Sequence, residues 1–420
     1  MIGLNTLTNE NISSLKASAT LAINERSIAL QQAGEPIIRL GFGQSPFPVP
    51  NLVVEALRQH AHQKDYLPVK GLYTLREAVA NYHQRKFSIH CTAEDVLIGP
   101  GSKELLFLTQ LIYKGTLMLP QPSWVSYAPQ AQLSRKQYVY LPTNKGENYM
   151  LSPQILEQHC AQLAQGPKIL LLNYPSNPTG ATLDSTQLMA LAEVARKYEI
   201  LILSDEIYGD THFTGAHQSI ARFYPEGTII SSGLSKWCGA GGWRLGTFVF
   251  PEQLRWLLDK MVVVASETFT STSAPIQYAA VAAYQAHPQI EDYLRKSRAI
   301  LQIIGEAVHT QLEAHQITCP KPSGGFYLMP DFSFYQNKLT KQGILNSRQL
   351  CDFILEELKV ALLPLSDFGM PDDFLGCRLS YVDFDGKKAL DLLTDTSTPE
   401  ELAPKVLQGI HHILAWITKT

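Results

Sequence analysis

A lysine and an arginine stand in a stretch of small residues, "SSGLSKWCGAGGWRLG", at positions 231–246. Glycine and serine let other groups approach the backbone closely, and Lys236 and Arg244 add positive charge there. A lysine in an apolar, glycine-rich setting is costly to keep charged, so we expect its pKa to fall and its amine to become nucleophilic. The alternative is a surface lysine that extends out of a loop. Judged from this segment alone, Lys236 is more typical of a surface lysine than of a nucleophile.

Acidic and amide side chains follow two apolar runs of the sequence. Asp205 and Tyr208 belong to "LSDEIYGD", and Asn177 belongs to "NYPSNPTG". An aspartate at the end of a buried strand is costly unless it meets a cation or a protonated nitrogen, although it could also cap a helix. We see no histidine at ligand spacing, so we expect no metal site. The Asn177 amide could donate to an anionic oxygen, or the segment could be a plain turn.

A second group of residues suits a phosphate and a flat ring. In "IGPGSKELLF" a strand is expected to end at Gly99, and Gly101, Ser102 and Lys103 precede or begin a helix. Free N–H groups at a helix start bind anions, although an ordinary tight turn explains the segment equally simply. The segment matches neither phosphate-loop nor dinucleotide fingerprints, which argues against ATP or nicotinamide cofactors. Trp124 in "PQPSWVSYAPQ" could stack on an aromatic ligand or belong to the core.

Taken together, these residues form a specific chemical set. They offer an amine for a Schiff base, a carboxylate for a ring nitrogen and an Asn/Tyr pair for a phenolate. They also offer a stacking tryptophan and an anion site with an arginine. Pyridoxal 5′-phosphate needs these groups, because a protonated pyridine held by an acid makes it an electron sink. We therefore expect pyridoxal phosphate as the cofactor.

The order of "NPTG", "SDEIY", "SK" and "GWRLG" resembles the class I and II pyridoxal-phosphate aminotransferases of fold type I, in their class I branch. The resemblance extends from "SATLAI" to "CRLSYV". It implies that Lys236 is the Schiff-base lysine and proton carrier, and that Asp205 is the pyridinium partner. It also implies that Asn177 and Tyr208 bind the cofactor O3′, so that Lys236, Asp205 and Tyr208 are the catalytic residues.

The resemblance implies further contacts with cofactor and substrate. The phosphate is assigned to the loop at Gly101, Ser102 and Lys103 and to Arg244, and Trp124 is assigned to the cofactor ring. Substrate binding is assigned to Gly43, Trp124, Asn177 and Arg378, of which Arg378 would clamp the α-carboxylate with its planar fork. Tyr66 would reach the phosphate of a neighbouring subunit, which implies a homodimer.

Two departures from the family pattern stand out. Gly233 occupies the position where the family often has a phosphate-binding serine, and Ser232 or Ser235 could substitute for it. The segment "VVVASETFTSTSAPIQ" lacks the arginine that dicarboxylate-specific members place there. Lys103 could instead supply a cation for an acidic substrate side chain, so the substrate preference stays open.

The elements that must position these residues alternate between strands and helices. Seven apolar runs end in turn residues and read as strands. Alternation with helices predicts an α/β fold with a mostly parallel sheet covered on both faces. Ligands bind beyond the carboxyl ends of such strands, which is where the residues above stand. The strand-like runs are residues 95–102, 115–123, 136–142, 168–180, 200–210, 228–236 and 244–251.

The C-terminal part has a different pattern. A long amphipathic helix over residues 291–315 precedes strands near 360–366 and 376–382, which predicts a smaller α+β domain. We therefore expect a large cofactor-binding domain over 46–289 and a small C-terminal domain over 290–420. Residues 1–45 form an N-terminal segment whose helix, around 21–32, packs with the small domain.

Composition excludes several classes of protein. Among 420 residues 17% are charged, the formal net charge is −3, and no basic run occurs, which argues against nucleic acid or an anionic membrane as a partner. Six scattered cysteines fit a reducing compartment. Because the sequence also shows no signal-peptide pattern and no membrane span, we expect a cytoplasmic protein.

Three functions remain to be weighed. We expect an aminotransferase that moves an amino group between an L-amino acid and a 2-oxo acid by ping-pong Schiff-base chemistry. The alternative is an α,β-lyase, either a C–S lyase or an enzyme similar to aminocyclopropane-carboxylate synthase, on the same scaffold. A regulatory ligand sensor ranks last, because about forty residues precede "LGFGQSP" and the charge does not favour DNA binding.

Overall fold

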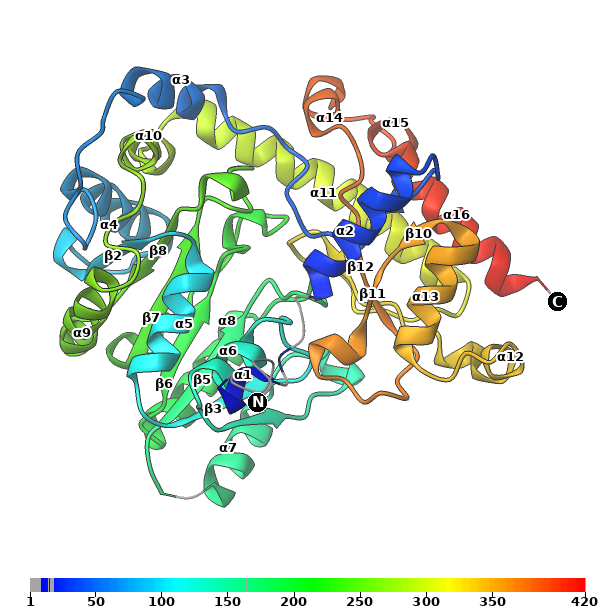
Figure 1. The fold of residues 1–420 in the computed structure, drawn as a ribbon, viewed down its shortest axis with the longest axis horizontal. Helices are drawn as coiled ribbons and strands as arrows, with labels where there is room; N and C mark the ends of the chain where they lie inside the picture. Colours follow the sequence, from blue (N-terminus) through cyan, green and yellow to red (C-terminus); the bar gives the residue numbers. More distant parts are fainter. Residues whose placement is uncertain (1–8, 14, 16–18, 164, 420) are drawn as a thin grey trace, which may run out of the picture.

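The computed structural model describes residues 9–13, 15, 19–163 and 165–419. A seven-stranded sheet in the order β2-β8-β7-β6-β5-β3-β4 forms one part of the molecule (Figure 1). Each strand falls within one of the seven runs predicted from sequence. Their bounds are β2 Val96–Gly99, β3 Thr116–Pro120, β4 Tyr138–Leu141, β5 Lys168–Asn173, β6 Leu201–Asp205, β7 Thr228–Gly233 and β8 Gly246–Val249.

The sheet is mostly parallel, as predicted. The four pairings that join β4, β3, β5, β6 and β7 are all parallel. Strand β8 runs antiparallel to both of its neighbours, β2 and β7. The carboxyl ends of β5, β6 and β7 therefore meet at one edge of the sheet, next to the loops that carry the predicted residues.

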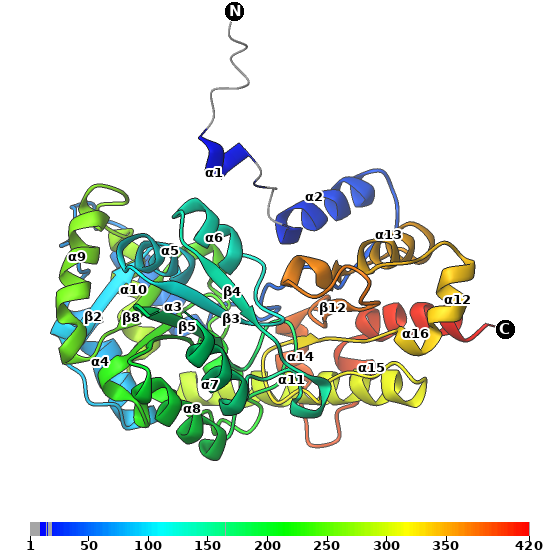
Figure 2. The same ribbon diagram turned by 90° about the horizontal axis from the view of Figure 1, so that it is seen from below.

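Helices cover both faces of this sheet. Helices α5 (Ser102–Ile112), α6 (Tyr127–Leu133) and α9 (Arg255–Ser266) pack on one face, and α7 (Pro153–Gln162) and α8 (Ser185–Lys197) pack on the other (Figure 2). Successive residues of a strand point to opposite faces, so Leu171 joins the first hydrophobic cluster while Leu170 joins the second. Burial on both faces explains why the strands are continuous apolar runs.

The C-terminal part begins with helix α11 (Pro288–Ala314), which extends from beside the large sheet into this part (Figure 1). A three-stranded antiparallel sheet in the order β11-β12-β9 follows, with β9 Tyr327–Leu328, β11 Leu363–Pro364 and β12 Cys377–Ser380. Helices α13 (Ser347–Leu358) and α16 (Pro404–Thr418) pack beside it. This α+β composition agrees with the prediction for the C-terminal part.

Helix α2 (Ala19–Gln32) contacts the C-terminal part through Arg26. Arg26 forms ion pairs with Asp352 at 2.9 Å and Glu356 at 2.7 Å on α13. Next to it, β1 (Ile38–Arg39) pairs in parallel with β10 (Val360–Ala361). Residues 1–8, 14 and 16–18 of the predicted N-terminal segment lie outside the described residues, and the domain boundaries at 45 and 289 stay a prediction.

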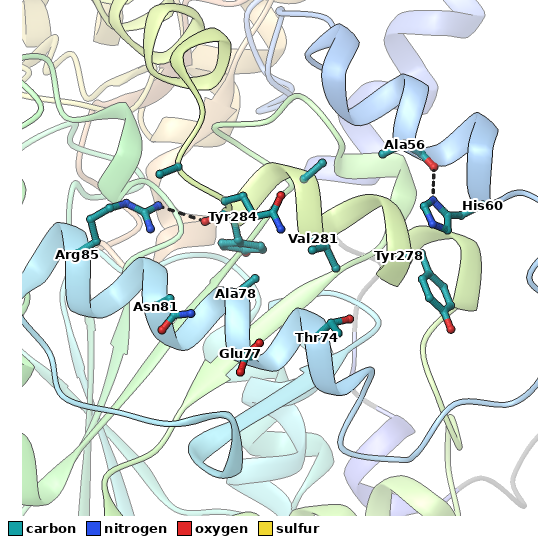
Figure 3. Close-up of a pocket in the computed structure, with 13 residues that line it drawn as sticks. Ala56, His60, Thr74, Glu77, Ala78, Asn81, Arg85, Tyr278, Val281 and Tyr284 are labelled. Carbon is teal, nitrogen blue, oxygen red and sulfur yellow. Dashed lines mark hydrogen bonds between the residues drawn. The ribbon is translucent and has the colours of Figure 1, made fainter.

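A groove of about 590 Å³ lies among helices α3 (Asn51–His60), α4 (Tyr73–Phe87) and α10 (Ala274–Tyr284). Figure 3 shows Arg85 at one end, where it donates to the Tyr284 carbonyl at 3.2 Å, and His60 at the other. The predicted site residues do not line this groove. All six cysteines are free thiols, and no helix in the described ranges is long and apolar enough to cross a bilayer.

Candidate active site

The residues predicted for the site gather around one cavity of about 490 Å³. It lies at the carboxyl ends of β5 and β6, where loops of the large sheet face β9 and β12 of the C-terminal part. Every predicted site residue except Gly101 and Tyr66 lines it. The lining includes Gly43, Ser102, Lys103, Trp124, Asn177, Asp205, Tyr208, Ser235, Lys236, Arg244 and Arg378.

Lys236 follows β7 and its amine lies inside the cavity. Its Nζ donates a hydrogen bond to the Gly43 carbonyl at 2.7 Å and lies 5.6 Å from the centre of the Tyr208 ring. Burial, with the positive charge of Arg378 as the next cause, lowers the pKa of Lys236 to about 7. The fall in pKa agrees with the expectation from sequence and makes a neutral, nucleophilic amine accessible near neutral pH.

Asp205 ends strand β6 and is almost completely buried. The Tyr127 hydroxyl donates to Asp205 Oδ2 at 2.7 Å, and the Ile207 N–H lies 3.4 Å from Oδ1. Burial raises the pKa of Asp205 to about 6, against the lowering effect of these hydrogen bonds. Among the described residues no cation forms an ion pair with this carboxylate, so it is available to a protonated nitrogen of a ligand.

Tyr208 and Asn177 both line the cavity, and each contacts a residue of the C-terminal part, Tyr327 and Arg378 respectively. The Tyr208 hydroxyl is 2.7 Å from the hydroxyl of Tyr327. The Asn177 backbone N–H donates to Asn173 Oδ1 at 2.8 Å, which fixes the turn after β5. Neutral hydroxyl and amide donors are the groups that a phenolate oxygen would need.

Arg378 is a buried cation on β12. Its guanidinium lies 4.8 Å above the Tyr327 ring, donates to Asn177 Oδ1 at 3.4 Å and also donates to the Gly41 carbonyl. In the part of the chain that the structure describes, it pairs with no carboxylate, and its Nε has no hydrogen-bond partner. An unpaired buried charge is costly, so this arginine is suited to an anionic ligand.

The loop between β2 and α5 forms a cradle for an anion. Gly101 has φ +96°, and a Cβ there would lie 2.2 Å from Arg244 Nη2, so glycine is required for the arginine to approach. Ser102 begins α5 with its free backbone N–H groups. Lys103 Nζ lies 4.9 Å above the Trp124 ring, and burial followed by the charge of Arg244 lowers the pKa of Lys103.

The structure explains the departure at Gly233. This residue pairs with Gly246 across β7 and β8, and a Cβ on Gly233 would lie 2.5 Å from the Leu245 carbonyl oxygen. A serine side chain therefore does not fit at this position without a backbone shift. Of the two candidate substitutes, Ser235 lines the cavity and Ser232 does not.

The cavity lining also includes residues that were not singled out from the sequence, and three of them contact predicted site residues. Tyr127 lies three positions after Trp124, and Asn173 ends β5 four positions before Asn177, so strand-end position was the signal for both. Tyr327 comes from the C-terminal part, and no local pattern places that part against the large sheet.

Two predictions concern residues outside this cavity. Tyr66 does not line it and is 89% exposed. The described ranges contain one group of potential metal ligands, His309, Glu313 and Cys319, whose ligand atoms lie within 4.8 Å of one another. Glu313 already accepts the Cys319 backbone N–H at 2.7 Å, and a ring nitrogen of His309 lies 3.2 Å from the Cys319 carbonyl. The expectation of no metal stays a prediction.

Comparisons with known proteins identify relatives over most of the chain. The sequence model of the family described as aminotransferase class I and II matches residues 35–381. An aspartate aminotransferase of Geobacillus stearothermophilus is 33% identical over 385 residues, which cover 89% of this chain and 93% of the relative. A probable aspartate/prephenate aminotransferase of Rickettsia felis is 30% identical over 383 residues, 88% of this chain and 91% of the relative.

Solved structures share the fold over nearly the whole chain. The aspartate aminotransferase of Thermus thermophilus with maleate superposes with a TM-score of 0.84 at 26% identity, covering 96% of this chain and 99% of that one. An aspartate aminotransferase of Rhizobium meliloti superposes with a TM-score of 0.81 at 25% identity, covering 98% of each chain.

Proposed function

The chain belongs to the class I and II aminotransferase family, and on that basis we propose roles for its site residues and a substrate class. It is a fold-type I, pyridoxal-phosphate-dependent transaminase that transfers an amino group between an L-amino acid and a 2-oxo acid. The names of the relatives favour transfer over the lyase alternative. The proposed residue roles depend on one observation. Lys236, Asp205 and Arg378, which pairs with no described carboxylate, all line the same cavity.

The donor set of the cavity fits pyridoxal phosphate. Without a Cβ at Gly101, the Arg244 guanidinium lies against the start of α5, so that its charge and the free N–H groups of that helix face one anion site. Asp205 offers a buried carboxylate without an ion-pair partner among the described residues, and Tyr127, which donates to it, contacts Trp124 edge to face. When bound, pyridoxal phosphate supplies an aldehyde that condenses with amines and a protonated pyridine ring that accepts electrons.

We assign the binding contacts as follows. Lys236 Nζ would hold the aldehyde carbon, Asp205 would accept from the ring N–H, and Trp124 would lie against the ring. Tyr208 and Asn177 donate to the phenolate oxygen, which stabilises its negative charge. The phosphate contacts would come from the backbone of the loop at Gly101, Ser102 and Lys103 and from the side chains of Ser235 and Arg244.

The proton transfer is assigned to Lys236. Its Nζ would carry the substrate α-proton, because a pKa near 7 allows the amine both to accept a proton and to release it. The Gly43 carbonyl, 2.7 Å from Nζ, orients the amine between these steps. Arg378 binds the substrate α-carboxylate through its planar fork, which directs the α-hydrogen towards the lysine.

We propose acidic amino acids as the preferred amino donors. The relatives described above carry names that include aspartate, and the Thermus structure is described with maleate, a dicarboxylate. Lys103 lies in the cavity wall, and no described carboxylate pairs with it. It therefore serves as the cation for the substrate side-chain carboxylate, in place of the arginine missing from residues 262–277.

We further propose that the enzyme is a homodimer that acts in the cytoplasm. Tyr66 is 89% exposed and lies outside the cavity of its own chain, which suits a side chain that reaches a partner's phosphate. Six free cysteines fit a reducing compartment. The proposed domains are residues 46–289 and 290–420, with the segment 1–45 packing on the second.

The first prediction concerns Lys236. Purified wild-type protein with pyridoxal phosphate is expected to show the visible absorption of the lysine-bound cofactor, and aspartate or glutamate is expected to convert that spectrum. Lys236→Ala is expected to lose both the band and turnover, because no amine remains at that position.

Lys387→Ala, at an exposed lysine outside the cavity, serves as the control for losing a lysine. An unchanged spectrum and rate in Lys236→Ala would contradict the assignment. A panel of amino acids tests the substrate class, and release of pyruvate and ammonia instead of conversion of the cofactor would support elimination.

A further inference from the structure

Tyr327 touches three parts of the active site at once. It is 1% exposed and stands at the start of β9. Its hydroxyl lies 2.7 Å from that of Tyr208, and its ring lies 4.8 Å below the Arg378 guanidinium. A Cβ on Gly43 would lie 2.1 Å from the same hydroxyl, so only a residue without a side chain leaves room for the Tyr327 hydroxyl at this position.

The fold fixes this tyrosine from both sides. In the β9–β12 ladder Tyr327 is opposite Ser380, two residues from Arg378 on the same strand, so the tyrosine and the arginine share one face of the sheet. Gly180 of "NPTG" has φ +71°, and a Cβ there would lie 2.4 Å from the Tyr327 carbonyl oxygen. The turn after β5 therefore holds the backbone of Tyr327 against the large sheet.

The two tyrosine hydroxyls cannot both donate to each other. Each carries one hydrogen, so Tyr208 can donate either to Tyr327 or to a ligand. Burial raises the pKa of both hydroxyl groups, and the positive charge of Arg378 acts against this rise at each of them. The Arg378 guanidinium lies 4.8 Å from the Tyr327 ring, and a cation this close makes the Tyr327 hydroxyl the better donor of the two.

We infer that Tyr327 is a positioning residue that donates to Tyr208 and so directs the single Tyr208 hydrogen towards the phenolate oxygen of the cofactor. Its ring at the same time supports the guanidinium of Arg378. The inference rests on the proposed function of this cavity. Tyr327 thus has two effects. Its hydroxyl acts on the cofactor through Tyr208, and its ring acts on the substrate carboxylate through Arg378.

Tyr327→Phe removes the hydroxyl and keeps the ring. Without the second donor, Tyr208 is a weaker and less oriented donor to the phenolate, and the deprotonated form of the lysine-bound cofactor loses stabilisation. The pKa read from its visible absorption is therefore expected to rise by about 0.5, which is the effect of one modest hydrogen bond. The kcat is expected to fall, while the KM for the amino donor stays within about twofold because the stack on Arg378 is kept.

Tyr327→Leu removes the ring as well. The KM for the amino donor is then expected to rise about tenfold, since the Arg378 guanidinium loses its aromatic support in a buried position. Tyr381→Phe is the matched control, because Tyr381 is also fully buried and its hydroxyl donates to the Gly325 carbonyl at 3.3 Å without lining the cavity. It is expected to leave the spectral pKa unchanged.

The outcomes separate the inference from the function on which it rests. If wild type and Tyr381→Phe show no lysine-dependent band, the proposed function fails. If both show the band and the spectral pKa of Tyr327→Phe equals theirs, the positioning role of the hydroxyl is overturned. If Tyr327→Phe raises KM as much as Tyr327→Leu does, the hydroxyl acts on the substrate and the division between hydroxyl and ring is wrong.

Discussion

At the scale of single residues, the cavity contains charges that the described part of the protein leaves unpaired. Arg378 is a buried cation without a carboxylate, and Asp205 is a buried carboxylate without an ion pair. Each is costly alone, and each matches a group of opposite charge on the cofactor or the substrate. Their separation within one cavity gives the ligand a direction, with the ring nitrogen at one end and the α-carboxylate at the other.

The pKa values of Lys236 and Asp205 predict how cofactor loading depends on pH. The pKa of Lys236 is lowered to about 7, so the neutral amine is the minor form below that pH and the major form above it. The pKa of Asp205 is raised to about 6, so its carboxylate also ionises as pH rises. Loading of pyridoxal phosphate into the cofactor-free protein is expected to accelerate about tenfold between about pH 6 and about pH 8, measured by stopped-flow absorbance.

Pyridoxamine phosphate provides the control for this prediction. It carries an amine instead of an aldehyde and forms no bond with lysine, so its binding lacks the step that requires neutral Lys236. A loading rate for pyridoxal phosphate that stays constant over this range, or falls with rising pH, would show that the amine of Lys236 is not the titrating group.

At the scale of elements, the β7–β8 pair sets the floor of the phosphate cradle. Gly233 and Gly246 are opposite each other, and a Cβ on Gly246 would lie 2.2 Å from the backbone nitrogen of Ser102. Helix α5 thus begins directly against this strand pair. The close approach explains why a family position that often carries serine carries glycine here.

The change Gly233→Ser tests this packing. Restoring the serine that the family often has is expected to weaken pyridoxal-phosphate binding at least about tenfold and to lower thermal stability, because the new Cβ meets the Leu245 carbonyl. Gly233→Ala is expected to weaken cofactor binding and to lower thermal stability to the same extent, because the clash comes from the Cβ and not from the hydroxyl. Tighter binding in Gly233→Ser than in Gly233→Ala, measured by fluorescence titration, would instead show that the serine reaches the phosphate.

Much of the large sheet was predictable from sequence, for local reasons. Each strand is an apolar run ended by turn residues, and the residues after β5 and β6 carry the polar groups of the site. The antiparallel direction of β8 was not predictable, because short apolar runs carry no information on direction. Strands such as β9 and β11 have two residues each and depend on tertiary pairing, which is why Tyr327 was missed.

At the scale of the whole molecule, the site combines residues from distant parts of the chain. Leu21 of α2, Tyr208 after β6 and Arg378 of β12 line one cavity. The family resemblance supplied Arg378 and Gly43, whereas periodicity alone gave no reason to place the C-terminal part over β5 and β6. The assembly of such parts depends on nonlocal packing that a residue pattern does not encode.

Tyr66 provides the prediction at this scale. Tyr66→Phe is expected to raise the dissociation constant for pyridoxal phosphate several-fold, because one hydrogen bond to an anion is lost. The thermal stability of the cofactor-free protein is expected to stay unchanged, because the Tyr66 side chain is 89% exposed. Sedimentation velocity should show dimers.

A mixing experiment tests whether Tyr66 acts across subunits. In a mixed dimer of one Lys236→Ala chain and one Tyr66→Phe chain, the cavity that keeps Lys236 belongs to the Tyr66→Phe chain and receives Tyr66 from its partner. That cavity is expected to bind the cofactor with wild-type affinity. Affinity as weak as in the Tyr66→Phe homodimer would mean that the tyrosine acts within its own chain.

The sheet order has a consequence for the ribosome-bound chain. Strand β2 is an edge strand whose neighbour is β8, so residues 96–99 find their partner when residues 246–249 have left the ribosome. Gly101 and Ser102 lie two and three residues after the end of β2, and Arg244 lies two residues before β8. The two halves of the phosphate cradle therefore meet late in synthesis, after β3 to β7 have emerged. A nascent chain released before β8 lacks the cradle, so cofactor capture reports completion of the large sheet and cannot guide its early folding.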